Sequence, residues 1–346
     1  PTLYDNFHIG HARVFVLVDL IIRLLESKSY IPHVIVNVTD IDPKLKEKNI
    51  NPDTIFKAFI DDLNNLEISD LIYAKTSDYV KEAKNLTAIL IKRKFAYSVN
   101  GNIYLDTSKF KKYGVLSHLS KSKLLDQRYD IDINKRNIMD IFLWNSSDSY
   151  GIEFNDKFLG DGTPWWHMQD TAVAMFHFNG NYDVHLGGID LCYPHHEILL
   201  STLMALSGKK RPVKCWMHVG ILDIENEKMS KSSGNAIYIK DLLKKYDANT
   251  LKLYFFSKKY RRILNFKFSE LKKFDKINSM IRNLVSNSDY KNEEYNIADK
   301  KINYAKESDI IKKFKNYIED DLDTSNALKL FLDTVRQPSK MKDAKK

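Results

Sequence analysis

The chain is poor in cysteine and has no long apolar run. Its 346 residues include only two cysteines, Cys192 and Cys215, which are too few for a disulfide scaffold and form no CxxC pair. The mostly apolar stretch from Phe15 to Leu25 is broken by Asp19 and Arg23 and is shorter than the roughly 18 residues of a membrane span. We also find no internal repeat. These absences argue against a disulfide-rich secreted domain and a membrane protein, and they predict a cytoplasmic one.

The length and charge describe a globular protein that suits a polyanionic partner. At 346 residues and 43% hydrophobic content, the chain is long enough for two or three domains with real cores. Lys and Arg number 54 against 45 Asp and Glu, a net charge of +9. Such a balance favours nucleic acid binding, although a lysine-rich surface from AT-rich codons looks the same. Charge alone therefore leaves the partner open.

Two short motifs far apart in the chain predict an ATP site. His8-Ile9-Gly10-His11 stands near the start, and Lys228-Met229-Ser230-Lys231-Ser232 stands far downstream. Histidines and free N–H groups at a helix start form an anion site, and Gly10 lets a nucleotide lie close to the backbone. Lys228 and Lys231 then supply positive charge to the phosphates. Two histidines three residues apart are more often an ordinary helix pair, so the prediction depends on both motifs occurring together.

The hydrophobic pattern predicts alternating helices and strands around these motifs. A buried helix is expected over 12–25 and a strand over 33–38, ending at 39–42, which is a β-α-β start. In such folds ligands bind at the carboxyl ends of parallel strands. The other expected elements are helical structure over 51–93, a strand over 102–106, a strand end at 183–185, a helix over 194–206, a strand over 215–221, and helices after 239.

The ordered motifs resemble those of the cysteinyl-tRNA synthetases, a family of class I aminoacyl-tRNA synthetases. The segments that carry the resemblance are 1–13, 37–42, 113–117, 166–167, 185–197, 216–218, 228–235 and 320–324. The resemblance implies an α/β fold with a Rossmann-like parallel-sheet catalytic domain, an inserted subdomain and an α-helical C-terminal region. The expected divisions are 1–50 and 136–240 for the catalytic domain, 51–135 for the inserted subdomain, 241–337 for the helical region, and 338–346 for a disordered basic tail.

The resemblance also implies a role for each matching residue. His8 and His11 match the histidines that contact the ATP phosphates, and Lys231 matches the lysine that stabilises the transition state. The amino-acid pocket is implied at Thr39, Trp166, His185 and Asp190, with Asp190 holding the substrate ammonium. Trp166 as a core aromatic and Asp190 as a helix cap are the plainer alternatives. ATP, Mg²⁺, cysteine and tRNA(Cys) are the implied ligands, and a monomer is expected.

The sequence departs from the family at its zinc site. Family members hold Zn²⁺ with two Cys, one His and one Glu, and the metal binds the substrate thiolate. Here His195 is kept, Asp170 stands at the position of one Cys, and Leu199 stands at that of the Glu; the other Cys would lie upstream of Pro1. Either Asp170 and His195 bind zinc with an upstream Cys, or the site has no metal. The changed positions favour metal loss. Leu186 also replaces a glycine of the family, and Cys192 is either a substitute thiol or a small buried residue.

Three other functions stay open at this point. They are a cysteine ligase of mycothiol-type synthesis, a paralogue that activates another amino acid, and a catalytically silent tRNA-binding protein. The many Lys, Ile, Asn and Tyr residues are typical of an AT-rich genome and argue against the mycothiol-type ligase. The intact residues of the histidine and lysine motifs argue against a catalytically silent protein. We further expect a fragment that lacks the extreme N-terminus and the anticodon-binding part, with tRNA phosphates bound by the basic stretch from Lys245 to Arg262.

Overall fold

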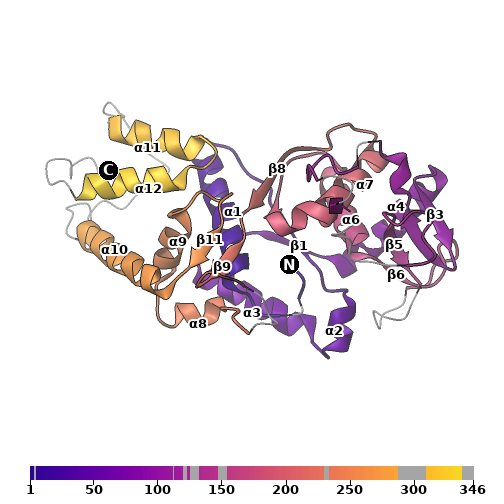
Figure 1. Ribbon diagram of the computed structural model, residues 1–346, viewed down its shortest axis with the longest axis horizontal. Coiled ribbons are helices and arrows are strands. Elements are labelled where there is room, and N and C mark those ends of the chain that lie inside the picture. The colour runs from indigo at the N-terminus through magenta and orange to yellow at the C-terminus, as the bar shows by residue number, and fades with distance from the viewer. Residues whose placement is uncertain are drawn as a thin grey trace. The chain divides into compact units, whose positions relative to one another are not determined.

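The computed structural model describes residues 1–3, 5–111, 113–119, 123–124, 132–146, 154–229, 234–286 and 309–336. The chain forms two compact units, which are treated separately below (Figure 1). The first unit contains residues 1–6, 32–61 and 69–218, and the second contains 7–31, 62–68 and 219–346. The expected tail at 338–346 lies outside the described residues.

A parallel strand pair opens the first unit. Strand β1, Ile35–Val38, pairs with β2, Ile72–Lys75, with Ile35 opposite Ile72. The intervening helices are α2, Pro43–Glu47, and α3, Pro52–Asn65. The expected strand is confirmed, but the prediction of purely helical structure over 51–93 is wrong at β2. Four residues between helices carry little periodic signal, and β2 is stabilised by a partner that is distant in the sequence.

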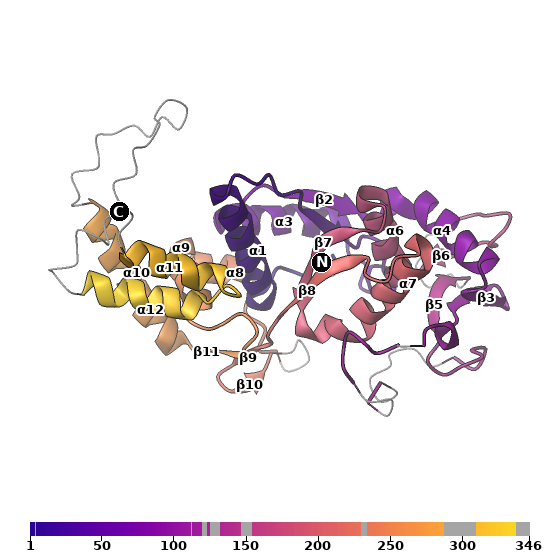
Figure 2. The same ribbon diagram turned by 90° about the horizontal axis from the view of Figure 1, so that it is seen from above.

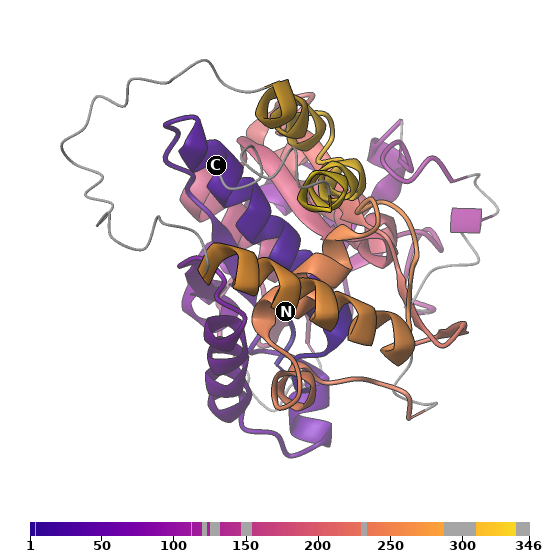
Figure 3. The same ribbon diagram turned by 90° about the vertical axis from the view of Figure 1, so that its left-hand side faces the viewer.

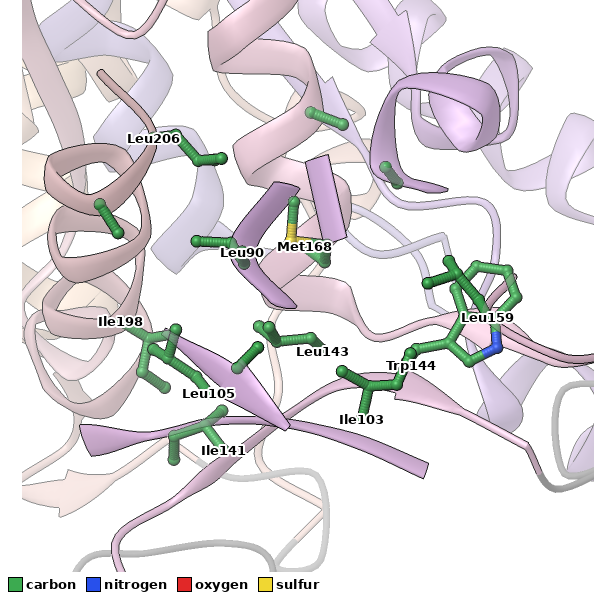
Figure 4. Close-up of a cluster of buried hydrophobic side chains, with 14 residues drawn as sticks. Leu90, Ile103, Leu105, Ile141, Leu143, Trp144, Leu159, Met168, Ile198 and Leu206 are labelled. Carbon is green, nitrogen blue, oxygen red and sulfur yellow. The ribbon is translucent and has the colours of Figure 1, made fainter. Parts of the chain in front are cut away.

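An antiparallel sheet and three helices build the main core of the first unit (Figure 4). Its strands are β3, Ala96–Val99; β4, Asn102–Leu105; β5, Ile141–Asn145; and β6, Thr163–Pro164, in that order. Helices α4, Val80–Lys92, α6, Trp166–Phe178, and α7, Glu197–Ser207, supply the facing side chains. Leu105, Leu143 and Trp144 are fully buried, and each such side chain contributes about 2 kcal/mol. The expected short strand at 102–106 is confirmed.

A second two-stranded sheet carries His185 of the predicted amino-acid pocket. Strands β7, Tyr182–Gly188, and β8, Val213–Val219, lie side by side (Figure 2). Short turns at Ile189–Leu191 and Cys192–His196 lead from β7 into α7. The expected helix over 194–206 and strands near 183–185 and 215–221 are confirmed with small shifts of their ends.

The second unit begins with α1, Ile9–Ser27, which confirms the predicted helix. A three-stranded sheet joins β9, Leu222–Ile224, to β10, Glu227–Lys228, and in parallel to β11, Leu264–Phe266. The prediction of only helices after 239 is wrong at β11. The remaining helices are α8, Ile239–Leu243; α9, Ala248–Phe256; α10, Phe268–Ser286; α11, Asp309–Glu319; and α12, Thr324–Val335.

Helices α11 and α12 lie side by side as a hairpin at the end of the described chain (yellow in Figure 3). The mixture of helices with parallel and antiparallel strands confirms the α/β class. Among the residues that the structure describes, no helix is long and apolar enough to span a membrane.

Candidate active site

The first histidine motif forms the N-terminus of α1. His8 is the N-cap residue, and its ring Nδ1 accepts the backbone N–H of His11 at 3.3 Å. The two rings stack with their centroids 3.6 Å apart. The first turn of α1 has no acidic side chain. Partial positive charge at this helix end is therefore available to an anion, and two imidazoles lie beside it.

Backbone hydrogen bonds hold the lysine motif's flank against this helix start. Ile9 N–H donates to the Ile237 carbonyl at 2.9 Å, and Ile239 N–H donates to the Phe7 carbonyl at 3.0 Å. On the other side of the loop, a Cβ at Gly10 would lie only 3.0 Å from the Met229 terminal methyl. The two motifs, more than two hundred residues apart in sequence, are thus neighbours within the second unit.

Of the two lysines of the motif, the structure describes only the backbone of Lys228. Lys228 ends β10, and its side chain lies outside the described part of the structure. Lys231 falls in the segment 230–233, which is not described. Their proposed contacts with phosphate remain predictions from the sequence.

Arg13 is a structural residue within the segment 1–13, and the sequence pattern predicted no role for it. Its side chain lies on the buried face of α1 and is 3% exposed. The guanidinium donates hydrogen bonds to the backbone carbonyls of Gly220, Ile221, Lys259, Tyr260 and Arg262, at 2.7 to 3.4 Å. Burial lowers its pKa to about 10, so the group stays charged at neutral pH. A charged residue inside an apolar helix run was the signal, because such a group needs partners.

Arg13 therefore fastens α1 to the chain just before the lysine motif and to the loop before β11. Gly220 is needed at this junction, because a Cβ there would collide with the carbonyl oxygens of Arg261 and Arg262. The first turns of α1 thus contact the lysine-motif segment on both of its flanks.

In the first unit, Asp170 and His195 contact each other directly. His195 Nε2 lies 2.5 Å from Asp170 Oδ2, and Asn37 donates its side-chain N–H to Asp170 Oδ1 at 2.9 Å. Both side chains of the pair are about nine-tenths buried. Burial opposes ionisation of Asp170, but His195 and the bond from Asn37 hold its pKa below the ordinary value. Trp166 stacks flat on the His195 ring with centroids 4.2 Å apart. Asn37, at the strand end, is a member of this group that the sequence interpretation missed.

A chain of hydrogen-bonded rings continues beside this pair. Tyr182 Oη lies 3.0 Å from His185 Nδ1, His185 Nε2 lies 3.2 Å from His196 Nε2, and His196 Nδ1 lies 2.9 Å from His218 Nε2. Burial lowers the pKa of His185 to about 3 and that of His196 well below its ordinary value. The two imidazoles are therefore neutral at pH 7, and each ring can donate at one nitrogen and accept at the other. Of these four residues the sequence predicted a pocket role only for His185, although His196 and His218 lie in segments that carry the family resemblance.

The other two predicted pocket residues, Thr39 and Asp190, differ in their burial. Thr39 is buried just beyond β1, where its N–H donates to the Pro1 carbonyl and its carbonyl accepts from Leu3. Asp190 is exposed on the turn Ile189–Leu191. The structure thus brings Trp166 and His195 into contact, whereas Asp190 stands in solvent.

The donor set does not fit a zinc ion. Leu199 is fully buried and packs among Ala174, Leu203 and Val213, so that position supplies no carboxylate. The carboxylate of Glu197, in the same turn of α7, accepts hydrogen bonds from the backbone N–H groups of Leu116 and Ser117. The oxygen Oδ2 of Asp170 and Nε2 of His195 are engaged with each other. Within the described ranges, no three His, Cys, Asp or Glu side chains gather as a metal site would require. We therefore derive no step through zinc.

The basic stretch before β11 is partly neutralised by carboxylates. Lys259 pairs with Asp323 at 2.7 Å, and Arg261 pairs with Asp321 at 2.7 Å. Lys252 lies 4.0 Å from Asp19 and 3.9 Å from Glu67. Within the stretch 245–262, the exposed cationic side chains that form no ion pair in the described structure are Lys245, Lys258 and Arg262.

Comparisons with known proteins agree with this arrangement. Residues 1–276 match the family described as the tRNA synthetases class I (C) catalytic domain, which makes the chain a class I synthetase. A cysteine–tRNA ligase of Thermoplasma acidophilum is 36% identical over 302 residues, covering 83% of this chain and 67% of that protein. One of Methanococcus aeolicus is 32% identical over 345 residues, covering 95% and 71%. The chain belongs to the cysteine–tRNA ligase family, and it spans about two thirds of the length of these curated relatives.

Solved structures support the fold. The methionyl-tRNA synthetase of Mycobacterium tuberculosis in complex with methionyl-adenylate superposes with a TM-score of 0.69 at 13% identity, covering 97% of this chain and 81% of that one. A putative arginyl-tRNA synthetase of Campylobacter jejuni gives a TM-score of 0.59 at 14% identity, covering 100% and 87%. The Rossmann-like catalytic fold expected from the sequence is thereby confirmed, whereas the detailed domain boundaries stay predictions.

Proposed function

We propose that this chain activates cysteine with ATP and transfers it to tRNA(Cys). The observation that carries the proposal is the contact of the two motifs: Ile9 bonds to Ile237, and Gly10 packs on Met229. A buried core role does not account for a histidine pair and a lysine loop held at one helix start. Their chemistry suits a nucleoside triphosphate, and the family is one of ligases that form aminoacyl-tRNA.

In the proposed first step, the amino-acid carboxylate attacks the α-phosphate of ATP, and pyrophosphate leaves. His8 and His11 bind phosphate oxygens at the N-terminus of α1, whose partial positive charge favours an anion, and the missing side chain of Gly10 admits Met229 of the lysine motif. Lys228 and Lys231 bring positive charge to the leaving pyrophosphate. ATP reacts as its magnesium complex, in which the cation offsets part of the phosphate charge. Catalysis thus depends on orientation and charge, without a covalent enzyme intermediate.

The amino acid is proposed to bind in the first unit, at the hydrogen-bonded side chains of Asn37, Asp170 and His195. Thr39 lies at the strand end beside Asn37, and Trp166 and His185 form aromatic walls. Asp190 is exposed on its turn and offers a carboxylate to the substrate ammonium. For tRNA, we propose contacts at the exposed Lys245, Lys258 and Arg262, because their charges have no carboxylate partner in the described structure.

The proposal is tested by ATP–pyrophosphate exchange with each of the twenty amino acids, followed by charging of tRNA(Cys). Cysteine is expected to drive exchange, and Lys231→Ala is expected to reduce it on the order of a hundredfold or more. Lys210→Ala, an exposed lysine on the loop before β8, is the matched control and should leave exchange unchanged. Undiminished exchange in Lys231→Ala would remove the lysine loop from the mechanism. Exchange without tRNA charging would favour the sugar ligase instead.

A further inference from the structure

The Asp170–His195 pair stands where the family resemblance implies a metal, and its own hydrogen bonds determine which nitrogen faces outward. Oδ1 of Asp170 accepts from Asn37, and Oδ2 lies against His195 Nε2. A carboxylate oxygen is an acceptor, so the proton of the ring stands on Nε2. In the neutral ring, Nδ1 is then the acceptor nitrogen. Asp170 thereby fixes the tautomer of His195, as carboxylates do for many functional histidines.

The nitrogen left over has no partner in the described structure. His195 is only 5% exposed, and its Nδ1 is buried and makes no hydrogen bond in the described structure. A buried acceptor without a donor is destabilising, so it is a group that a ligand can satisfy. Both nitrogens of the neighbouring His167 are buried and unbonded as well. Trp166 stacks on His195 and lies tilted by 35° against His167, with centroid distances of 4.2 Å in both cases, and forms an apolar wall beside these nitrogens.

We propose that His195 Nδ1, held by Asp170, receives the side-chain donor of the amino-acid substrate, so that this chain binds the substrate side chain through a hydrogen bond and not through a metal. This inference rests on the proposed function and names how the amino acid is recognised. Asp170 is a positioning residue, because it acts through His195. The ligand class is a small amino acid that ends in a thiol or hydroxyl. A thiol is the weaker hydrogen-bond donor of the two, so this site should separate cysteine from serine only through size and packing.

The first measurement needs no variant. The purified full chain is assayed for zinc by mass spectrometry, and cysteine- and serine-dependent exchange is measured before and after chelation, with magnesium restored. We expect well under one zinc per chain, exchange that survives chelation, and a cysteine-to-serine ratio of kcat/KM of about a hundredfold or less. One tightly bound zinc per chain, with exchange lost on its removal, overturns the inference and leaves the proposed function standing. No exchange with any amino acid overturns both.

A matched pair of substitutions locates the contact on the ring. The amide of asparagine reaches the place of Nδ1, and that of glutamine reaches the place of Nε2, while both remove the stacking on Trp166. His195→Asn is therefore expected to keep a kcat/KM for cysteine about tenfold above that of His195→Gln, the worth of one hydrogen bond. Equal values, or a higher value for His195→Gln, would show that Nδ1 does not contact the substrate.

A third variant tests the positioning role of Asp170. Asp170→Asn should raise the KM for cysteine and for serine about tenfold and leave the KM for ATP unchanged. Asp183→Asn is the control, since Asp183 is exposed on β7 and pairs only with Lys214 in the described structure. A change in Asp170→Asn that falls equally on ATP and amino acid would indicate general structural damage and contradict the role. Thermal stabilisation by cysteinyl- and seryl-sulfamoyl adenosine gives the same comparison without catalysis.

Discussion

Replacing Arg13 with methionine should destabilise the second unit strongly. Methionine keeps much of the aliphatic volume but removes all five hydrogen bonds to backbone carbonyls. The two at 2.7 Å, to Gly220 and Arg262, are charge-assisted and worth about 1.5 kcal/mol or more each, which gives a loss of about 3 kcal/mol. For a unit of this size the midpoint of thermal unfolding should fall by roughly 6–12 °C. Arg13→Lys should fall between, because an ammonium has three donors and a shorter reach.

The assay is thermal unfolding followed by circular dichroism, with ATP-dependent exchange measured below the transition. Lys28→Met is the control, because Lys28 ends the same helix and makes a half-exposed pair with Glu319 that is worth at most about 1 kcal/mol. Arg13 also fastens the flank of the lysine motif, so Arg13→Lys should raise the KM for ATP even at temperatures where it is folded. A midpoint for Arg13→Met within 2 °C of the control would refute the reasoning, since ~3 kcal/mol cannot then reside in these bonds.

Three further predictions concern the second unit. Gly220→Ala should lower the unfolding midpoint by several degrees, because its Cβ meets the carbonyls of 261 and 262, and an unchanged midpoint would show that this turn yields easily. The bond from Arg261 lowers the pKa of Asp321, and at Asp323 the bonds from Lys259 and Asn326 outweigh the opposing effect of burial. Both pKa values are lower in the folded state, so this stabilisation is complete above about pH 4 and is lost as pH falls through the folded values. Asp321→Asn with Asp323→Asn should therefore flatten the dependence of the unfolding midpoint on pH between 2 and 5, and an unaltered slope would contradict it. Lys258→Ala should lower tRNA affinity and reduce the salt slope by about one, whereas Lys259→Ala, whose charge is paired, should change the slope less; filter binding across salt concentrations decides between them.

The strongly periodic elements were predictable from the sequence, and the short strands were not. Helix α1 carries a continuous apolar face, and β1 and α7 have clear patterns with recognisable ends. Strands β2 and β11 have four and three residues, and each is stabilised by pairing with a strand far away in the sequence. No local signal separates such segments from helix ends or loops. Their existence depends on tertiary pairing.

The candidate site shows the same division between residue identity and contact. The sequence marks His8, Gly10 and His11 as one motif, but only the fold shows that Met229 packs on Gly10. Arg13 lies within the first matching segment, but its partners are main-chain carbonyls, which cannot be identified from the pattern of side chains in the sequence. A buried arginine in an apolar helix was the available clue, and it predicts that partners exist without saying which.

The changes at Asp170 and Leu199 make physical sense as one set. An aspartate in place of a thiolate needs compensation when buried, and here it has two donors, from Asn37 and His195. A leucine in place of a carboxylate removes a charge that would otherwise be buried without a cation to balance it, and Leu199 joins the apolar cluster with Leu203 and Val213 instead. If only position 170 had changed, the carboxylate at position 199 would be buried without a partner. If only position 199 had changed, the ring of His195 would lack the carboxylate that now accepts its N–H. Together they give a hydrogen-bonded group of Asn37, Asp170 and His195 with an open acceptor at His195 Nδ1, and a site of that kind recognises a donor on its ligand more readily than it holds a metal.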